Sequence, residues 1–183
     1  MLRRVRSVLL AATAIAATAI VGGTMITPAT AQESSRPRVS DCSTSRDAIL
    51  DLPHQMFAAW EKGDGPAFAS VFVDDGHMIT SSGTYLPSRT AVSNYFTAAF
   101  AGPLKGTRQV GNPSSLRCLA PNVAVIDGLG GTVLPGETYT TPEEVPIGRR
   151  IIVSWVAVQV PHPSIARVTV WKMTEFQSTT IAA

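Results

Sequence analysis

The stretch WEKGDGPAFASVFVDDG, residues 60–76, decides the fold because it holds two helix boundaries and a turn. Gly63-Asp64-Gly65 ends one helix, and Pro66 fits the first turn of a second, where a proline needs no hydrogen-bond donor. Asp74-Asp75-Gly76 favours a turn before a short strand, His77 to Thr80. Helices that lead directly into a strand predict a domain of the α+β class.

Before this stretch, from Ser45 to Lys62, apolar residues recur at steps of three and four, which predicts an amphipathic helix. Pro53 interrupts that pattern and should kink the helix or mark a restart with Asp51 as its cap. After the stretch, the sequence predicts a very short strand at Thr84–Leu86 and a third helix at Arg89–Phe100.

Beyond the third helix the pattern becomes alternating, as in β-strands. The four strand-like runs are residues 107–119, 123–134, 149–160 and 166–177. Short links join the first pair and the last pair, so neighbouring strands should be antiparallel. The intervening segment 135–148 holds three prolines and predicts a mobile loop. We therefore expect three N-terminal helices packed on one face of a four-strand antiparallel sheet.

The third of these strands is apolar on both alternations. Ile151, Val153 and Trp155 share one face, while Ile152, Val156 and Val158 share the other. Helices on one side of the sheet would leave the second set exposed to water. A second subunit is the simplest cover, so the sequence predicts a homodimer through the outer sheet face.

The N-terminus has the pattern of an export signal. Arg3, Arg4 and Arg6 precede an uncharged run of 14 residues, Val8–Val21, and Ala29-Thr30-Ala31 offers small residues for cleavage. The run is too short to span about 30 Å of hydrocarbon, although an uncleaved N-terminal anchor is the alternative. We predict a signal peptide at 1–31, cleaved after Ala31, and a secreted protein without a stable membrane span.

Residues 32–43, rich in Ser, Arg and Pro, predict a flexible linker after the signal peptide. Without residues 1–31 the chain has 12 basic and 13 acidic residues, a net charge of −1, which argues against nucleic acid as a partner.

Both cysteines, Cys42 and Cys118, lie in the exported part, where cysteines usually pair. The alternative is a buried Cys118 with a free Cys42. The three histidines show no ligand spacing with either cysteine, so no metal site is expected.

Four segments together resemble a known family. They are residues 60–76, GTYLPSR (83–89), LRCLAPNVAVIDGLGG (116–131) and RVTVWKMTEFQ (167–177). They are similar to the SnoaL-like, or nuclear-transport-factor-2-like (NTF2-like), superfamily, and within it most to the SgcJ/EcaC group. The resemblance covers nearly the whole exported part, so we place the SnoaL-like domain at 44–178, with a tail at 179–183. It implies a cone-shaped fold, in which the curved sheet and the helices enclose one apolar pocket.

The resemblance also implies a chemistry, because relatives place a carboxylate or a histidine in this pocket, where desolvation raises a carboxyl pKa. Asp127 lies among apolar residues in mid-strand and is our first candidate for a general acid or base. The alternative is a carboxylate that faces solvent or is hydrogen-bonded within the sheet. His77 and Glu175 are further catalytic candidates, with a surface histidine and an exposed strand-end glutamate as the alternatives.

Five aromatic residues are candidates for the pocket lining, with core packing as the alternative for each: Trp60, Tyr85, Tyr95, Trp155 and Trp171. No Gly-rich phosphate loop, Ser-His-Asp order or metal cluster stands out, so no cofactor is expected. An enzyme of this kind would then use cofactor-independent acid/base chemistry, as a cyclase, isomerase or hydrolase. The oxidoreductase label of the SgcJ/EcaC group rests on gene context and is set aside.

Two hypotheses follow. The first is a secreted SnoaL-like domain that binds a small apolar or aromatic molecule in its pocket, with or without acid/base catalysis on it. The second is a homodimeric, non-catalytic interaction or envelope protein whose pocket is vestigial. A closed pocket with a buried carboxylate would favour the first, and a pocket plugged by Trp and Phe side chains would favour the second.

Overall fold

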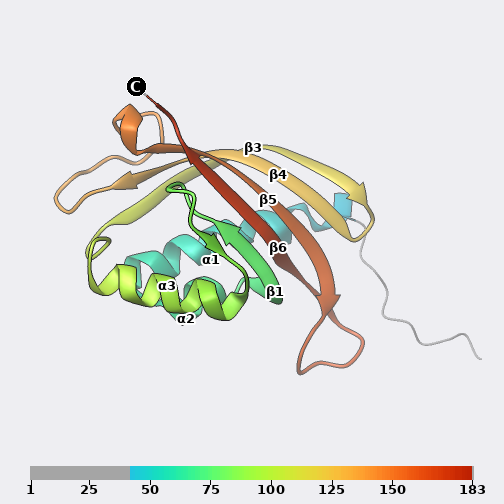
Figure 1. Ribbon diagram of the computed structural model, residues 1–183. Helices are drawn as coiled ribbons and strands as arrows, with labels where there is room; N and C mark the ends of the chain where they lie inside the picture. Colours follow the sequence, from blue (N-terminus) through green and yellow to red (C-terminus); the bar gives the residue numbers. More distant parts are fainter. Residues whose placement is uncertain (1–41, 183) are drawn as a thin grey trace, which may run out of the picture. The chain divides into compact units, whose positions relative to one another are not determined.

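Six strands form a mixed sheet that curves over three α-helices in the computed structural model, which describes residues 42–182 (Figure 1). The helical elements are the 3-10 helix η1 (Cys42–Ser45), α1 (Arg46–Lys62), α2 (Gly65–Ala69), α3 (Arg89–Ala101) and the 3-10 helix η2 (Ile147–Arg149). The strands are β1 (Phe72–Ile79), β2 (Tyr85–Leu86), β3 (Arg108–Ala120), β4 (Val123–Val133), β5 (Arg150–Pro161) and β6 (Thr169–Thr180). The predicted signal peptide, residues 1–31, and linker residues 32–41 lie outside the described residues.

The sheet has the strand order β2-β1-β6-β5-β4-β3. The predicted antiparallel meander is present as β3 to β6, but the expectation of a four-strand sheet was wrong. The β1–β2 hairpin joins the sheet because β1 pairs with β6 in parallel, at His77 with Glu175 among other positions. These two strands lie about a hundred residues apart in the sequence, so no local pattern indicates that they pair.

Strand β1 begins five residues earlier than predicted, at Phe72 rather than His77. Phe72 pairs with Met173 and His77 pairs with Glu175, so β1 has four residues between these pairs where β6 has one, Thr174. The Asp74-Asp75-Gly76 sequence therefore lies in a bulge within the strand and does not form a turn ahead of it.

Helix α1 runs without a break through Pro53, so the predicted restart was wrong. Asp51 accepts a side-chain hydrogen bond from Gln55 (2.7 Å) instead of capping a new helix. Leu52 and Met56 on either side of the proline are buried, and this packing offsets the one hydrogen bond that Pro53 cannot donate. Gly63 ends α1 in the left-handed conformation, as glycine readily does.

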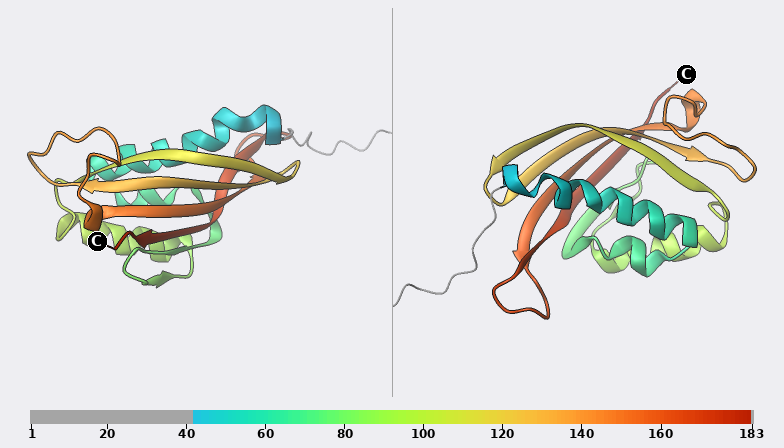
Figure 2. Two further views of the ribbon diagram at one scale, coloured as in Figure 1. Left: turned by 90° about the horizontal axis from the view of Figure 1, so that it is seen from above. Right: turned by 180° about the vertical axis from the view of Figure 1, so that it is seen from behind.

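The three α-helices lie on one face of the sheet, here called the inner face (Figures 1 and 2). The burial pattern of β5 shows how the chain alternates between this face and the outer face. Val153, Trp155 and Ala157 are buried under the helices, whereas Ile152 on the outer face is 56% exposed. The alternation predicted for this strand is therefore confirmed.

Cys42 and Cys118 form a disulfide, with their Cα atoms 5.9 Å apart. It joins η1, immediately before α1, to the far end of β3. Cys42 is fully buried, and its backbone N–H donates to the carbonyl of Pro121 (2.8 Å). The N-terminal edge of the described domain is therefore held to the β3–β4 hairpin by a covalent bond and a hydrogen bond.

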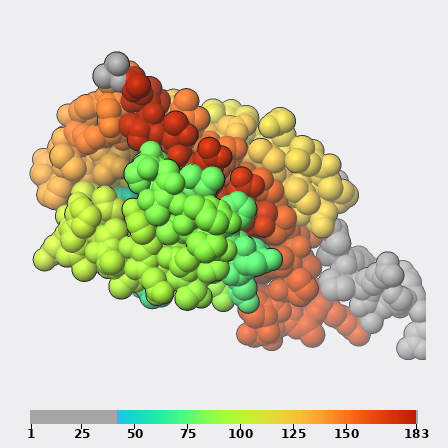
Figure 3. Space-filling view, in the orientation of Figure 1, coloured from blue at the N-terminus to red at the C-terminus, as the bar shows by residue number. Residues whose placement is uncertain are grey.

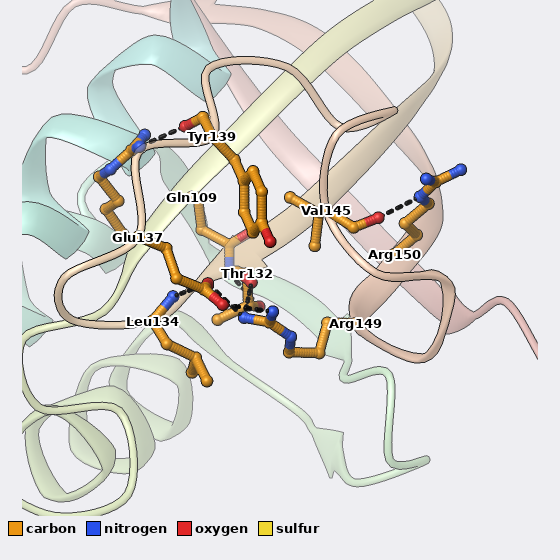
Figure 4. A network of polar contacts seen from close by, with 9 residues as sticks. Gln109, Thr132, Leu134, Glu137, Tyr139, Val145, Arg149 and Arg150 are labelled. Carbon is orange, nitrogen blue, oxygen red and sulfur yellow. Dashed lines mark hydrogen bonds and ion pairs between the residues drawn. The ribbon is translucent and has the colours of Figure 1, made fainter.

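The segment between β4 and β5, expected to be a mobile loop, is tied to the sheet by a polar network (Figure 4). Arg149 makes two hydrogen bonds to the Glu137 carboxylate (2.6 and 2.7 Å), and a third to the carbonyl oxygen of Thr132 (3.2 Å). Arg108 and Arg150 bind backbone carbonyls of the same segment, at Tyr139 and Val145. Here the prolines and acidic residues belong to an ordered strap, residues 134–149.

The strap also covers part of the outer sheet face. Val145 is fully buried against Val110 and Val133. These two valines lie on the outer face, because their chain neighbours Gln109 and Thr132 lie on the inner face. Gly131 makes room for Val145, since a Cβ there would lie 3.0 Å from the Val145 side chain. Figures 1 and 2 show η2, at the end of this segment, on the side of the sheet away from the helices.

Candidate functional site

A cavity of about 250 Å³ lies between the helices and the inner face of the sheet. Its floor is apolar, because buried or partly buried side chains of several elements line it: Phe57 and Trp60 from α1, Phe96 from α3, Met78 from β1 and Trp155 from β5. The wall therefore combines residues that are far apart in the sequence but meet through the packing of the helices on the sheet.

An aromatic cluster supports the helical side of the cavity. The rings of Phe68 and Phe96 lie 4.1 Å apart, and the Trp60 ring packs edge-on against Phe68 and Phe100 at 5.9 and 5.2 Å. The Trp60 indole donates a hydrogen bond to the Thr107 hydroxyl (2.9 Å), which fixes the ring orientation. The cavity is therefore bounded by rigid side chains and is not plugged by them.

Two glycines let the walls approach the sheet closely. At Gly111 a Cβ would lie 2.7 Å from the Phe57 ring, and at Gly130 it would lie 3.1 Å from the Ile151 side chain. Both glycines line the cavity, from β3 and β4. The absence of side chains here leaves space on the inner face that a valine or leucine would fill.

Within the described residues 42–182, no Asp, Glu, Lys or Arg lines the cavity. Its polar side chains are hydroxyls and carboxamides, and its titratable side chains are His54 and Tyr95. The Gln109 amide donates to the Thr132 hydroxyl (2.9 Å), so two of the polar groups are held together at one side (Figure 4). The indole N–H of Trp155 is buried and has no acceptor among residues 42–182. This site can hold an uncharged apolar molecule, but it has no carboxylate to move a proton.

Asp127 does not line the cavity, and the expectation that its pKa is raised there was wrong. It lies on the outer face of β4, where its neighbours Ile126 and Gly128 take the buried positions. Its carboxylate accepts hydrogen bonds from Ser154 (2.8 Å) and Ser115 (2.9 Å) on the two flanking strands. The Ser154 and Ser115 hydrogen bonds, aided by Arg117 at 3.9 Å, lower the pKa of Asp127 below its ordinary value.

His77 and Glu175 also lie outside the cavity lining, on adjacent strands of the outer face. The His77 Nε2 atom and the Glu175 Oε1 atom are 4.0 Å apart, and the His77 ring lies 5.6 Å from the exposed Tyr85 ring. The structure therefore brings two of the three predicted catalytic residues together, but on the wrong face for the cavity. In the space-filling view β6 reaches the surface beside the β1–β2 region (Figure 3).

Three of the five predicted pocket aromatics line the cavity, namely Trp60, Tyr95 and Trp155. Tyr85 is exposed, and Trp171 is buried in the hydrophobic core without lining the cavity. Tyr85 lies on the strand face opposite to its buried neighbour Leu86.

Several lining residues were not predicted from the sequence, because the catalytic candidates on the strands were chosen from polar residues alone. On β1 and β6 the inner-face residues are Met78 and Phe176, the direct neighbours of His77 and Glu175. The signal was present in the alternation, since Met78 follows His77 and a polar residue usually takes the exposed side. Phe57, Phe68 and the glycines offered no comparable signal.

Within residues 42–182 no helix is long and apolar enough to cross a membrane. The same residues contain no cluster of three His, Cys, Asp or Glu side chains that could bind a metal ion.

The fold and the cavity together define a class: an α+β domain with a curved sheet wrapped around helices and one internal apolar pocket. No known protein family and no curated protein matches the sequence, but solved structures do match. A domain of unknown function with a cystatin-like fold from Nostoc punctiforme aligns with a TM-score of 0.65 and 25% identity, over 77% of this chain and 80% of that one.

Two further structures agree. An NTF2-like protein with a cystatin-like fold from Novosphingobium aromaticivorans aligns with a TM-score of 0.60 and 14% identity, over 75% of this chain and 82% of that one. An uncharacterized protein with a cystatin-like fold from Caulobacter vibrioides aligns with a TM-score of 0.58 and 22% identity, over 76% of this chain and 91% of that one. The chain therefore has the cystatin-like fold of NTF2-like proteins, as the sequence resemblance implied, while the finer placement in the SgcJ/EcaC group stays a prediction.

Proposed function

We propose that this protein is exported and binds a small apolar or aromatic molecule in its internal cavity, as a binding protein rather than an acid/base enzyme. The observation that carries the proposal is an apolar cavity of about 250 Å³ with no carboxylate in its lining. The volume lies just below the range of roughly 300–1,000 Å³ that is usual for ligand pockets, so a compact ligand is favoured.

Catalysis is disfavoured by the positions of the candidate groups. A general acid or base must come within hydrogen-bond reach of the proton that it transfers. Asp127, His77 and Glu175 lie on the outer face, on the other side of the sheet from the cavity. Of the two hypotheses, ligand binding without catalysis is the better supported, because aromatic side chains do not plug the cavity and none of its lining residues is Asp, Glu, Lys or Arg.

Export is the second part of the proposal. The disulfide between Cys42 and Cys118 supports it, because such bonds persist mainly in oxidising compartments. Protein recovered outside the cytoplasm should begin at or near Gln32, and N-terminal sequencing checks this. An intact Met1 on membrane-bound protein would contradict it.

We also propose that a second copy of this chain is the partner at the outer sheet face. Ile152 is 56% exposed there, and Val156 and Val158 are partly exposed on the same side of β5. The strap covers only the Val110–Val133 end of this face. An apolar strand surface that the chain leaves uncovered supports an interface.

Binding can be tested by thermal shift and calorimetry with small uncharged aromatics, such as naphthalene and indole, on wild type and two matched variants. Val153→Phe places a ring in the cavity, whereas Ile152→Phe places the same ring on the opposite face of the same strand. We expect wild type and Ile152→Phe to bind, and Val153→Phe to lose at least tenfold in affinity. Equal binding by the two variants, or no binding by wild type, would refute the proposal.

A further inference from the structure

We infer that the cavity selects for charge: it accepts molecules with an apolar body and a neutral hydrogen-bonding group, and rejects their ionised analogues. This inference rests on the proposed binding function and names the class of ligand that the site takes. Ketones, amides and alcohols fit the description, whereas carboxylates and ammonium ions do not.

The first support is the composition of the lining. None of its side chains is a carboxylate, an ammonium or a guanidinium group. The polar groups that it does contain include neutral donors and acceptors, among them Thr80, Ser82, Gln109, Asn112, Thr132 and Ser178. Such groups can satisfy a carbonyl, an amide or a hydroxyl on a ligand, but none of them can neutralise an ion.

The second support is the position and pairing of the charged side chains near the cavity. Arg149 reaches a lining residue, through the carbonyl oxygen of Thr132, but its guanidinium is paired with the Glu137 carboxylate at 2.6 and 2.7 Å. Asp127, in the neighbouring part of β4, is held on the outer face by two serine hydroxyls. Charges next to the cavity are therefore either paired or turned away from it.

The physical consequence follows from the cost of desolvation. A charge moved from water into a poorly polar site is strongly disfavoured unless a counter-ion or several hydrogen bonds receive it. Among residues 42–182, no carboxylate, ammonium or guanidinium group lines the site to act as a counter-ion.

Three probes of nearly equal size test the inference by calorimetry at one neutral pH: 2-acetylnaphthalene, 2-naphthoate and 2-(aminomethyl)naphthalene, whose amine is protonated. We expect the ketone to bind and each ion to bind at least tenfold more weakly. If either ion binds within threefold of the ketone, the charge selectivity is overturned while the binding function stands. If none of the three binds, the proposed binding function fails, and the inference fails with it.

A charge placed in the lining gives the reciprocal test. Gln109→Lys introduces a cation at the cavity wall, and Gln109→Met is its uncharged control. We expect Gln109→Lys to bind 2-naphthoate at least fivefold more tightly than wild type, and Gln109→Met to show no such gain. If Gln109→Lys does not fold, Thr132→Lys with Thr132→Val as its control serves the same purpose. A folded lysine variant that binds the anion no better than wild type would contradict the inference.

Discussion

At the scale of single residues, the strand alternation decides whether a polar side chain acts in the cavity or on the surface. Asp127 is surrounded in sequence by apolar residues, which suggested a buried acid. Its partners Ser115 and Ser154 come from β3 and β5, the strands that flank it in the sheet. Three separate segments thus build a hydrogen-bonded carboxylate on the outer face, and this arrangement stabilises the charged form.

Asp127→Asn should therefore destabilise the protein at neutral pH. Solvent reaches 40% of the Asp127 side chain, so we expect a loss of about 1 kcal/mol or less. Because the pKa of Asp127 is lowered on folding, its contribution is present above the unfolded value of about 3.9 and is lost as pH falls through the folded value. Urea unfolding of both proteins between about pH 7 and pH 3 should show the difference shrinking at the acid end. The exposed Asp75→Asn serves as control, and a difference that grows toward acid would contradict this account.

Gly65 shows how one missing side chain sets a helix contact. A Cβ at Gly65 would lie 2.5 Å from the Thr97 backbone nitrogen and 2.8 Å from the Ser93 carbonyl oxygen. Both atoms belong to α3, so α2 and α3 must separate to admit even a methyl group. Gly65→Ala should cost roughly 2 kcal/mol or more in the free energy of unfolding. Gly148→Ala, with nothing within 4 Å of its Cβ, should change it little, and equal effects in urea unfolding would refute the argument.

At the scale of elements, the strap (residues 134–149) shows why composition alone misjudged a loop. Prolines, glycines and glutamates are typical of mobile segments. In this segment Glu137 binds Arg149 and the Leu134 backbone N–H, while Glu144 accepts from the backbone N–H groups of Thr140 and Thr141. The acidic residues order the segment because each carboxylate closes a local turn.

Glu137→Gln should loosen the strap without unfolding the sheet. The Arg149 hydrogen bonds, and then the Leu134 N–H, lower the pKa of Glu137, so the ion pair should persist as pH falls below the ordinary glutamate value. Hydrogen exchange measured by mass spectrometry should be faster across 134–149 in the variant and unchanged in β5. Glu143→Gln is the matched control, because Glu143 binds Arg150 through its backbone carbonyl oxygen, which the substitution keeps. Identical exchange in the strap for both variants would show that the ion pair does not order it.

At the scale of the whole molecule, the outer sheet face is divided into a part that the chain covers and a part that it does not. Val145 covers Val110 and Val133, and Ile152 stays more than half exposed. The residues expected to be catalytic, Asp127, His77 and Glu175, lie on this same face. The face therefore combines apolar and polar groups, which is the composition of many protein interfaces.

Sedimentation at micromolar concentration should show two chains. Ile152→Lys should shift the equilibrium toward monomers, because an ammonium group would be buried without a partner in the interface. Ile165→Lys, at an exposed isoleucine in the β5–β6 loop, is the control and should leave the dimer intact. A monomeric wild type would contradict the proposed dimer and would show that the strap alone covers enough of the outer sheet face.

The sequence by itself predicted most of the helices and strands and the alternation within β5, and it favoured the pairing of the two cysteines. These features depend on local periodicity, or on the oxidising compartment that exported proteins enter, and they do not depend on the positions of residues distant in the sequence. The segments around α1, α3 and the β3–β6 meander were predictable for that reason. The resemblance in residues 60–76 and 116–131 also pointed to the correct fold.

Only the tertiary structure decided the parallel pairing of β1 with β6, the side to which Asp127 points, and the shape and charge of the cavity. Periodicity shows that a strand has two faces, but both faces of β4 hold apolar residues, so the pattern of this strand cannot say which face meets the helices. The cavity is a space left between the three α-helices and five strands, β1 and β3 to β6, bounded by residues as distant as Phe57 and Phe176. Such a space depends on how the elements pack together, and no single segment of the sequence encodes it.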